Sequence, residues 1–91
     1  MVNISRLPCY PKGDLRRLLA VIAAIDAAGE ASLTDIEKAT GLNRKTIFDL
    51  IEKAKEQANL TIAKEGYYYR IVDWGVVINP EGARMAYTGQ L

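Results

Sequence analysis

The stretch that decides the fold is residues 33–52, Leu33-Thr-Asp-Ile-Glu-Lys-Ala-Thr-Gly-Leu-Asn-Arg-Lys-Thr-Ile-Phe-Asp-Leu-Ile-Glu52. Thr34 followed by Glu37 matches a capping box, in which each side chain bonds the backbone N–H of the other residue. The stretch therefore predicts a short helix that starts at Thr34 and ends at Gly41. Asn43 is a good cap for a longer helix over residues 44–59. The stretch therefore predicts two helices that are joined by a tight turn at Gly41.

Upstream of this unit, residues 12–28 have the spacing of an amphipathic helix. Their apolar stripe recurs at three- and four-residue intervals, and Gly29 follows where a helix commonly ends. The stripe consists of Leu15, Leu18, Leu19, Ile22 and Ile25. Residues 1–11 lack periodicity and contain Pro8 and Pro11. The sequence thus predicts an N-terminal arm over residues 1–11 and a single domain over residues 12–91.

Downstream, the periodicity changes to that of strands. Leu60 and Ile62 alternate with polar residues, Glu65-Gly66 is a turn signal, and residues 67–72 are rich in strand formers. A β-hairpin over residues 60–72 is predicted, and residues 74–78 extend it or form a short third strand. Asn79-Pro80-Glu81 then predicts a small final helix, because a cap, a proline and an acid stand in helix-starting order.

The tyrosine run in the hairpin should present two faces. On a strand, Tyr67 and Tyr69 point one way, while Tyr68 and Arg70 point the other. We expect one pair to pack on the helices and the other to lie exposed, where it could stack on bases or bury a partner protein. Trp74 is expected in the core or at a dimer contact.

Length and composition exclude several classes of protein. A chain of 91 residues, 49% hydrophobic and 25% charged, has the size and balance of one globular domain. With no histidine and only Cys9, it cannot build a Cys/His zinc site or an imidazole-activated nucleophile. We therefore expect no enzyme, no metal and no cofactor. No stretch is long and apolar enough to span a bilayer, and no leader is visible, so a cytoplasmic protein without membrane contact is expected.

Charge is unevenly distributed along the chain, although the net charge is only +1. Residues 1–17 and 43–64 are net positive, whereas residues 18–42 are net negative. A basic face assembled from the two positive blocks would be modest.

The order of helix, short helix, turn, helix and hairpin resembles a winged helix domain, an α+β fold built on a helix-turn-helix unit. The unit is similar to the N-terminal domains of IclR-type and MarR-type regulators, and residues 78–84 (Ile-Asn-Pro-Glu-Gly-Ala-Arg) are similar to the helix start after a MarR-type wing. The resemblance covers roughly residues 15–84. The positions that lock the two helices of the unit together are Ile36, Ala39, Leu42, Ile47 and Leu50.

The resemblance implies a DNA-binding transcriptional regulator. Its 44–59 helix would enter the major groove of double-stranded DNA, and its 60–72 hairpin would serve as the wing. A homodimer is expected, because two half-sites add contacts. The implied DNA contacts are Asn43, Arg44, Lys45, Thr46, Phe48, Asp49 and Lys53 from the 44–59 helix and its cap, Lys64 and Arg70 from the hairpin, and Arg16 and Arg17 from the first helix.

Two alternatives remain open on the sequence. The first is a winged helix that contacts a protein partner through Phe48 and Tyr67–Tyr69, which fits the low net charge and the phosphate-repelling Asp49. The second is a winged helix that binds RNA or acts in replication.

Overall fold

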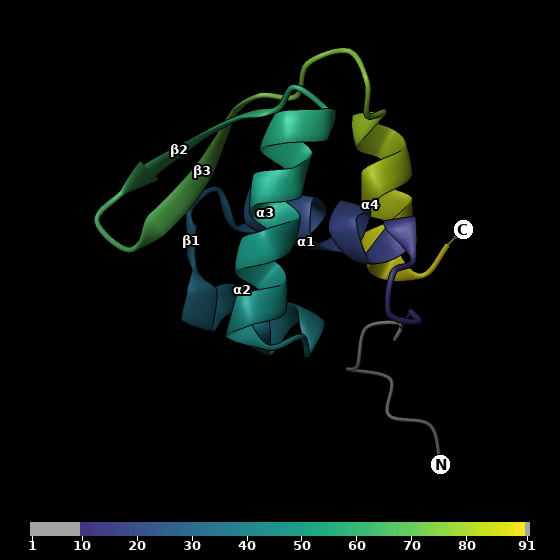
Figure 1. The fold of residues 1–91 in the computed structure, drawn as a ribbon, viewed down its shortest axis with the longest axis horizontal. Helices are drawn as coiled ribbons and strands as arrows, with labels where there is room; N and C mark the ends of the chain where they lie inside the picture. Colours follow the sequence, from purple (N-terminus) through teal and green to yellow (C-terminus); the bar gives the residue numbers. More distant parts are fainter. Residues whose placement is uncertain (1–9, 91) are drawn as a thin grey trace.

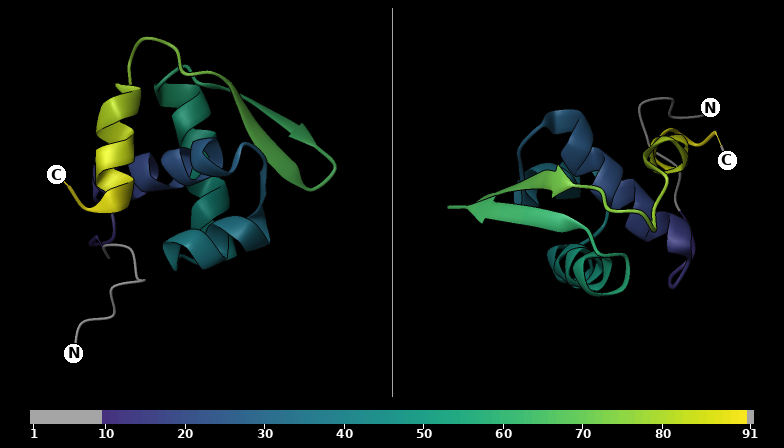
Figure 2. Two further views of the ribbon diagram at one scale, coloured as in Figure 1. Left: turned by 180° about the vertical axis from the view of Figure 1, so that it is seen from behind. Right: turned by 90° about the horizontal axis from the view of Figure 1, so that it is seen from above.

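The computed structural model describes residues 10–90, so Cys9 and most of the predicted arm lie outside the described residues. In chain order the elements are α1 (Leu15–Ala28), β1 (Ala31–Ser32), α2 (Leu33–Thr40), α3 (Arg44–Gln57), β2 (Thr61–Glu65), β3 (Tyr68–Asp73) and α4 (Pro80–Thr88). Figures 1 and 2 show α1 crossing between α3 and α4, behind α3 and in front of α4 in Figure 1, with the β2–β3 hairpin reaching out on the side away from α4.

The core forms where α1, α2 and α3 meet. Its largest fully buried side chains include Ile22 and Ile25 of the predicted apolar stripe, Ile36 and Ile47 of the predicted locking positions, and Ile51. Leu42 and Leu50, predicted to lock the two central helices, are partly buried against the same core. The hydrophobic effect therefore holds the three helices around one compact centre.

Helix α1 starts later than the sequence predicted. Asp14 adopts an extended conformation, and its carboxylate accepts a hydrogen bond from the backbone N–H of Arg16, so the helix begins at Leu15 rather than at Lys12. Leu15, predicted on the buried stripe, is 67% exposed, because the first residue of the helix lies beyond the edge of the core.

The predicted capping box at Thr34 and Glu37 is wrong. The capping pair is Ser32 and Asp35, whose side chains each accept from the other residue's backbone N–H at 3.1 and 3.0 Å. The shift has a tertiary cause: Ser32 is held extended in β1, opposite Tyr68 of β3, so the helix begins directly after it at Leu33.

The turn between α2 and α3 matches the prediction. Gly41 is left-handed at φ 75°, a conformation that costs a residue with a Cβ atom about 1–2 kcal/mol. Asn43 caps α3 by accepting from the N–H of Thr46 at 2.8 Å. Helix α3 ends at Gln57, two residues before the predicted end, because the chain turns at Asn59, which has a φ of 57°.

The sheet is three-stranded and antiparallel, in the order β1-β3-β2. The prediction of a third strand or an extension at residues 74–78 is wrong, since the third strand is the two-residue β1, with Ala31 opposite Tyr69. Residues 74–78 turn instead at Gly75, whose φ is 70°. A Cβ atom at Gly75 would lie 2.9 Å from the backbone oxygen of Asn59, so this loop passes close over the end of α3.

The tyrosines divide differently from the predicted alternation. Tyr69 is 5% exposed and packs in the core, but Tyr67 lies in the turn before β3 and is exposed. The expected Tyr67–Tyr69 pair on one face is therefore wrong, because the strand begins only at Tyr68. Tyr68 and Arg70 are both exposed, and Trp74 is partly buried against the core.

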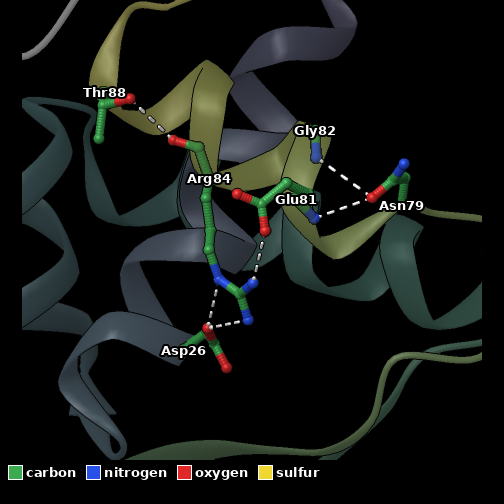
Figure 3. Close-up of polar contacts among 6 residues, drawn as sticks. All are labelled: Asp26, Asn79, Glu81, Gly82, Arg84 and Thr88. Atoms are coloured by element: carbon green, nitrogen blue, oxygen red, sulfur yellow. Dashed lines mark hydrogen bonds and ion pairs between the residues drawn. The ribbon is translucent and has the colours of Figure 1, made fainter.

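Helix α4 forms as predicted and packs on α1. Asn79 caps it by accepting from the N–H groups of Glu81 and Gly82 (Figure 3). Ala83 and Ala86 are fully buried, and Arg84 donates to Asp26 of α1 at 3.2 and 3.3 Å (Figure 3). Small side chains let α4 approach α1 closely, and the ion pair joins the two helices at their surface.

Three helices followed by a hairpin and a C-terminal helix form the winged-helix pattern, an α+β fold. In the second view of Figure 2 the hairpin projects well beyond the helices, as a wing does.

Candidate nucleic-acid interface

The first turn of α3 is the centre of the candidate interface. Asn43 bonds one backbone N–H of this turn, and Arg44 and Lys45 extend from it with exposed side chains. Unpaired amides and the helix dipole favour a phosphate at such a helix start. The turn thus combines two cations with an anion-attracting backbone.

Arg44 is held against α2. Its guanidinium donates to Thr34 Oγ1 at 2.7 Å and to Glu37 Oε1 at 3.1 Å. Glu37, predicted to take part in a capping box, is therefore the ionic partner of a predicted DNA contact. The Arg44 side chain remains 58% exposed, so a phosphate or base edge can reach it.

Lys45 lies over the next turn of the same helix. Its Nζ atom is 3.6 Å from Asp49 Oδ2, and both side chains are largely exposed. An exposed pair of this kind contributes about 0–1 kcal/mol, so an incoming phosphate replaces it at small cost. The pair also reduces the repulsion that Asp49 alone would exert on DNA.

Phe48 lies off the buried stripe, as the sequence indicated. Its side chain is 45% exposed, while the neighbouring Ile47 is fully buried. An exposed aromatic ring at the start of α3 can contact a thymine methyl group or a hydrophobic partner.

The wing carries both cations that were predicted there. Lys64 faces Tyr69 across the two strands, with its Nζ atom 5.5 Å from the ring centroid. Arg70 lies 3.7 Å from Glu65 Oε1 and is exposed. Both side chains stay accessible on the projecting hairpin, where they can contact a DNA backbone.

The other predicted contacts occupy a different part of the molecule. Arg16 pairs with Asp14 at 2.7 Å and lies over the Tyr10 ring at 4.5 Å, whereas Arg17 donates to the Tyr10 carbonyl. Arg17 lines a groove between α1, α3 and α4 together with Thr46, Asp49 and Lys53 of α3. Arg17 and Lys53 thus line this groove, Thr46 and Asp49 connect it to the α3 start, and Arg16 lies outside it beside Tyr10.

The groove itself escaped the sequence analysis. It has a volume of about 690 Å³, and the first turns of α1, one side of α3 and the start of α4 form its walls. Helices α3 and α4 both pack on α1 but barely on each other, and the groove lies between them. Its apolar lining includes Leu15, Leu19, Leu50, Val77 and Ile78. No local pattern could reveal it, because its walls come from three separate segments.

Two acids near helix starts have shifted pKa values. The Arg16 side chain, followed by its backbone N–H, lowers the pKa of Asp14 to about 2. The backbone N–H of Ser32 lowers the pKa of Asp35. The Asp14 shift reflects its contact with the Arg16 side chain and then helix capping, the Asp35 shift reflects the capping box, and neither marks a reacting group.

No family model, curated protein or solved structure matches this chain. Within residues 10–90, no cluster of His, Cys, Asp and Glu is arranged to hold a metal ion. In the same span, every helix is too short or too polar to cross a membrane.

Proposed function

We propose that this chain is a non-enzymatic transcriptional regulator that binds double-stranded DNA, with a domain of the MarR or IclR type. The observation that carries the proposal is the exposed, Asn43-capped first turn of α3, which bears Arg44 and Lys45 in a fold whose hairpin projects as a wing. A protruding helix start fits the major groove, and a hairpin cation can contact the flanking backbone.

The charges along α3 favour contact through its start rather than its whole length. Lys45, Asp49, Glu52 and Glu56 recur at helical spacing along one side of the helix, and the last three are acidic. Phosphates close to this side of the later turns would be repelled. The helix would therefore point its first turn into the groove, which is the part of a recognition helix that reads base edges.

Affinity for DNA of random sequence would be modest, because the predicted contacts are few and the net charge is +1. Each neutralised phosphate contributes a slope of about −0.9 to the dependence of log affinity on log salt. A dimer would double the number of contacts and match the two half-sites of a palindrome.

The first test measures binding of a fluorescent DNA duplex by anisotropy across a salt series. We expect saturable binding that weakens linearly with log salt. Combined Arg44→Ala and Lys45→Ala substitution should weaken binding by about tenfold or more, since each lost contact costs about 1–3 kcal/mol. Lys55→Ala is the matched control, because Lys55 is also an ion-paired cation of α3 but lies in its last turn. Equal losses in both variants would contradict the proposed orientation.

A gain-of-binding variant tests the role of Arg44 more directly. Glu37→Gln removes the carboxylate that Arg44 now contacts at 3.1 Å, which frees the guanidinium for a phosphate or a guanine. We expect tighter duplex binding and a steeper salt dependence. Unchanged affinity in the same anisotropy assay would place Arg44 outside the interface.

A second candidate function is contact with a protein partner. The exposed Phe48, Tyr67 and Tyr68 favour it, as does the pairing of Arg44, Lys45 and Arg70 with carboxylates. Under this function, no salt-dependent duplex binding should be seen, and Phe48→Ser should abolish partner binding while the Arg44 and Lys45 variants retain it. Single-stranded DNA and structured RNA in the same titrations separate the RNA-binding alternative.

A further inference from the structure

Exposed apolar side chains gather around the groove between α3 and α4. Leu15 and Val77 line it and are 67% and 57% exposed, and Val76, the neighbour of Val77, is 95% exposed. Burying large aliphatic side chains is favourable, so leaving three of them in water along one groove and its adjoining loop is unfavourable. Such a patch is typical of a contact surface.

The valine pair sits on a loop that is anchored at both ends. Asp73 accepts from the N–H of Gly75 at 2.8 Å, and Gly75 passes so close to the Asn59 carbonyl that no Cβ atom would fit. At the other end, Ile78 packs against the core and Asn79 caps α4. The loop therefore presents Val76 and Val77 as a preformed apolar knob beside an apolar groove, so little conformational entropy remains to be lost on contact.

Knob and groove on one face suit a second copy of the same chain. In a twofold dimer each copy offers the same patch, so the knob of each protomer can enter the groove of its partner. A stable interface takes roughly twenty residues a side, and the groove lining together with the knob forms a set of that size.

The charged residues that line the groove also favour a second copy of this chain over a partner protein that is uniformly acidic or uniformly basic. Lys12, Arg17 and Lys53 line the groove together with Asp14 and Asp49. A uniformly acidic or basic partner would place like charges opposite one another, which costs binding energy. A second copy brings both signs and can pair each with its opposite.

We propose that this chain forms a twofold homodimer in which the Val76–Val77 knob of each copy fills the α1–α3–α4 groove of the other. Arg44 and the wing lie outside this surface, whereas Thr46 and Asp49, near the start of α3, line the groove. The dimer is tested without DNA, so that its outcome is separate from that of the proposed DNA binding.

The test is sedimentation velocity on the full chain over a dilution series, with the matched variants Val76→Asp and Val72→Asp. Val72 is a 53% exposed valine on the hairpin, outside the groove, so both variants add one carboxylate at an exposed valine. We expect a dimer that dissociates on dilution. Val76→Asp should raise its dissociation constant by about tenfold or more, because the symmetry buries the carboxylate twice, while Val72→Asp should leave it unchanged.

A second variant tests the groove side. Leu15→Glu changes an exposed groove residue and should weaken the dimer as Val76→Asp does, while circular dichroism shows an unchanged fold. A monomer at every concentration, or equal effects of Val76→Asp and Val72→Asp, would overturn the proposed interface. If the chain is a monomer and still binds a DNA duplex, the proposed DNA-binding function is supported and only the dimer is rejected.

Discussion

Asp14 fixes the start of α1 with one carboxylate. That group caps the helix through the backbone N–H of Arg16 and also forms two hydrogen bonds with the Arg16 side chain, at 2.9 and 2.7 Å. The same side chain lowers the pKa of Asp14 to about 2, since it stabilises the charged form. The guanidinium of Arg16 also lies over the ring of Tyr10, whose hydroxyl donates to the Ala86 carbonyl of α4. Asp14 thereby fixes both the first turn of α1 and the position of the Arg16 side chain against Tyr10.

The lowered pKa predicts a particular pH dependence. A carboxyl group whose folded-state pKa is depressed adds stability above its unfolded value of 3.8, and this contribution is lost as the pH falls towards about 2. Asp14→Asn keeps a good cap residue but removes the charge. We expect the variant to melt below the wild type at neutral pH, and the gap to close as the pH falls from 3.8 to about 2. Thermal melting of both proteins over this range checks it, and a gap independent of pH would refute it.

At the scale of elements, the glycine turns differ in what surrounds them. Gly41 and Gly75 both have positive φ angles, yet a Cβ atom at Gly41 would meet nothing within 4 Å, whereas one at Gly75 would lie 2.9 Å from the Asn59 oxygen. Glycine is therefore needed at position 41 only for its left-handed backbone conformation. At position 75 it also allows the 74–78 loop to pass close to the backbone of Asn59.

The comparison predicts unequal costs of substitution. Gly41→Ala should lower the free energy of unfolding by about 1–2 kcal/mol, the strain of a left-handed alanine. Gly75→Ala should cost more, because the clash with a backbone oxygen adds to the same strain. Urea denaturation of the two variants measures both values, and equal losses would show that the 74–78 loop shifts away freely.

The whole molecule depends on how α4 is attached to α1. Two kinds of contact join them, the fully buried Ala83 and Ala86 and the partly exposed ion pair between Arg84 and Asp26. Tight packing of small residues leaves no room for added methylenes, whereas exposed ion pairs contribute little. Packing is therefore the main attachment of the C-terminal helix.

If packing is the main attachment, two neighbouring substitutions should lower the stability of the fold by unequal amounts. Arg84→Ala should destabilise the fold by no more than about 1 kcal/mol. Ala86→Leu, which forces extra volume between the helices, should cost about 1–3 kcal/mol. Urea unfolding followed by tryptophan fluorescence gives both values, and a larger loss for Arg84→Ala would show that the ion pair dominates.

Much of the candidate interface could be predicted, because helical spacing already placed Arg44, Lys45 and Phe48 at the start of an exposed helix face. Their partners could not be predicted. Arg44 bonds Thr34 and Glu37 across the α2–α3 turn, and this contact depends on where α2 begins. That beginning was misplaced, since a short strand, and not the local capping pattern, determines it.

The sequence alone determined the order of helices and hairpin, the Gly41 turn, the Asn43 and Asn79 caps and the buried isoleucine stripes. These features depend on residues within about four positions of one another, so local periodicity and cap chemistry suffice to define them. Only the tertiary structure decided that β1 pairs with β3, that Asp26 meets Arg84 58 positions away, and that α1, α3 and α4 enclose a groove. Such contacts arise when distant segments pack around a common core, and no local pattern in the chain records which segments will meet.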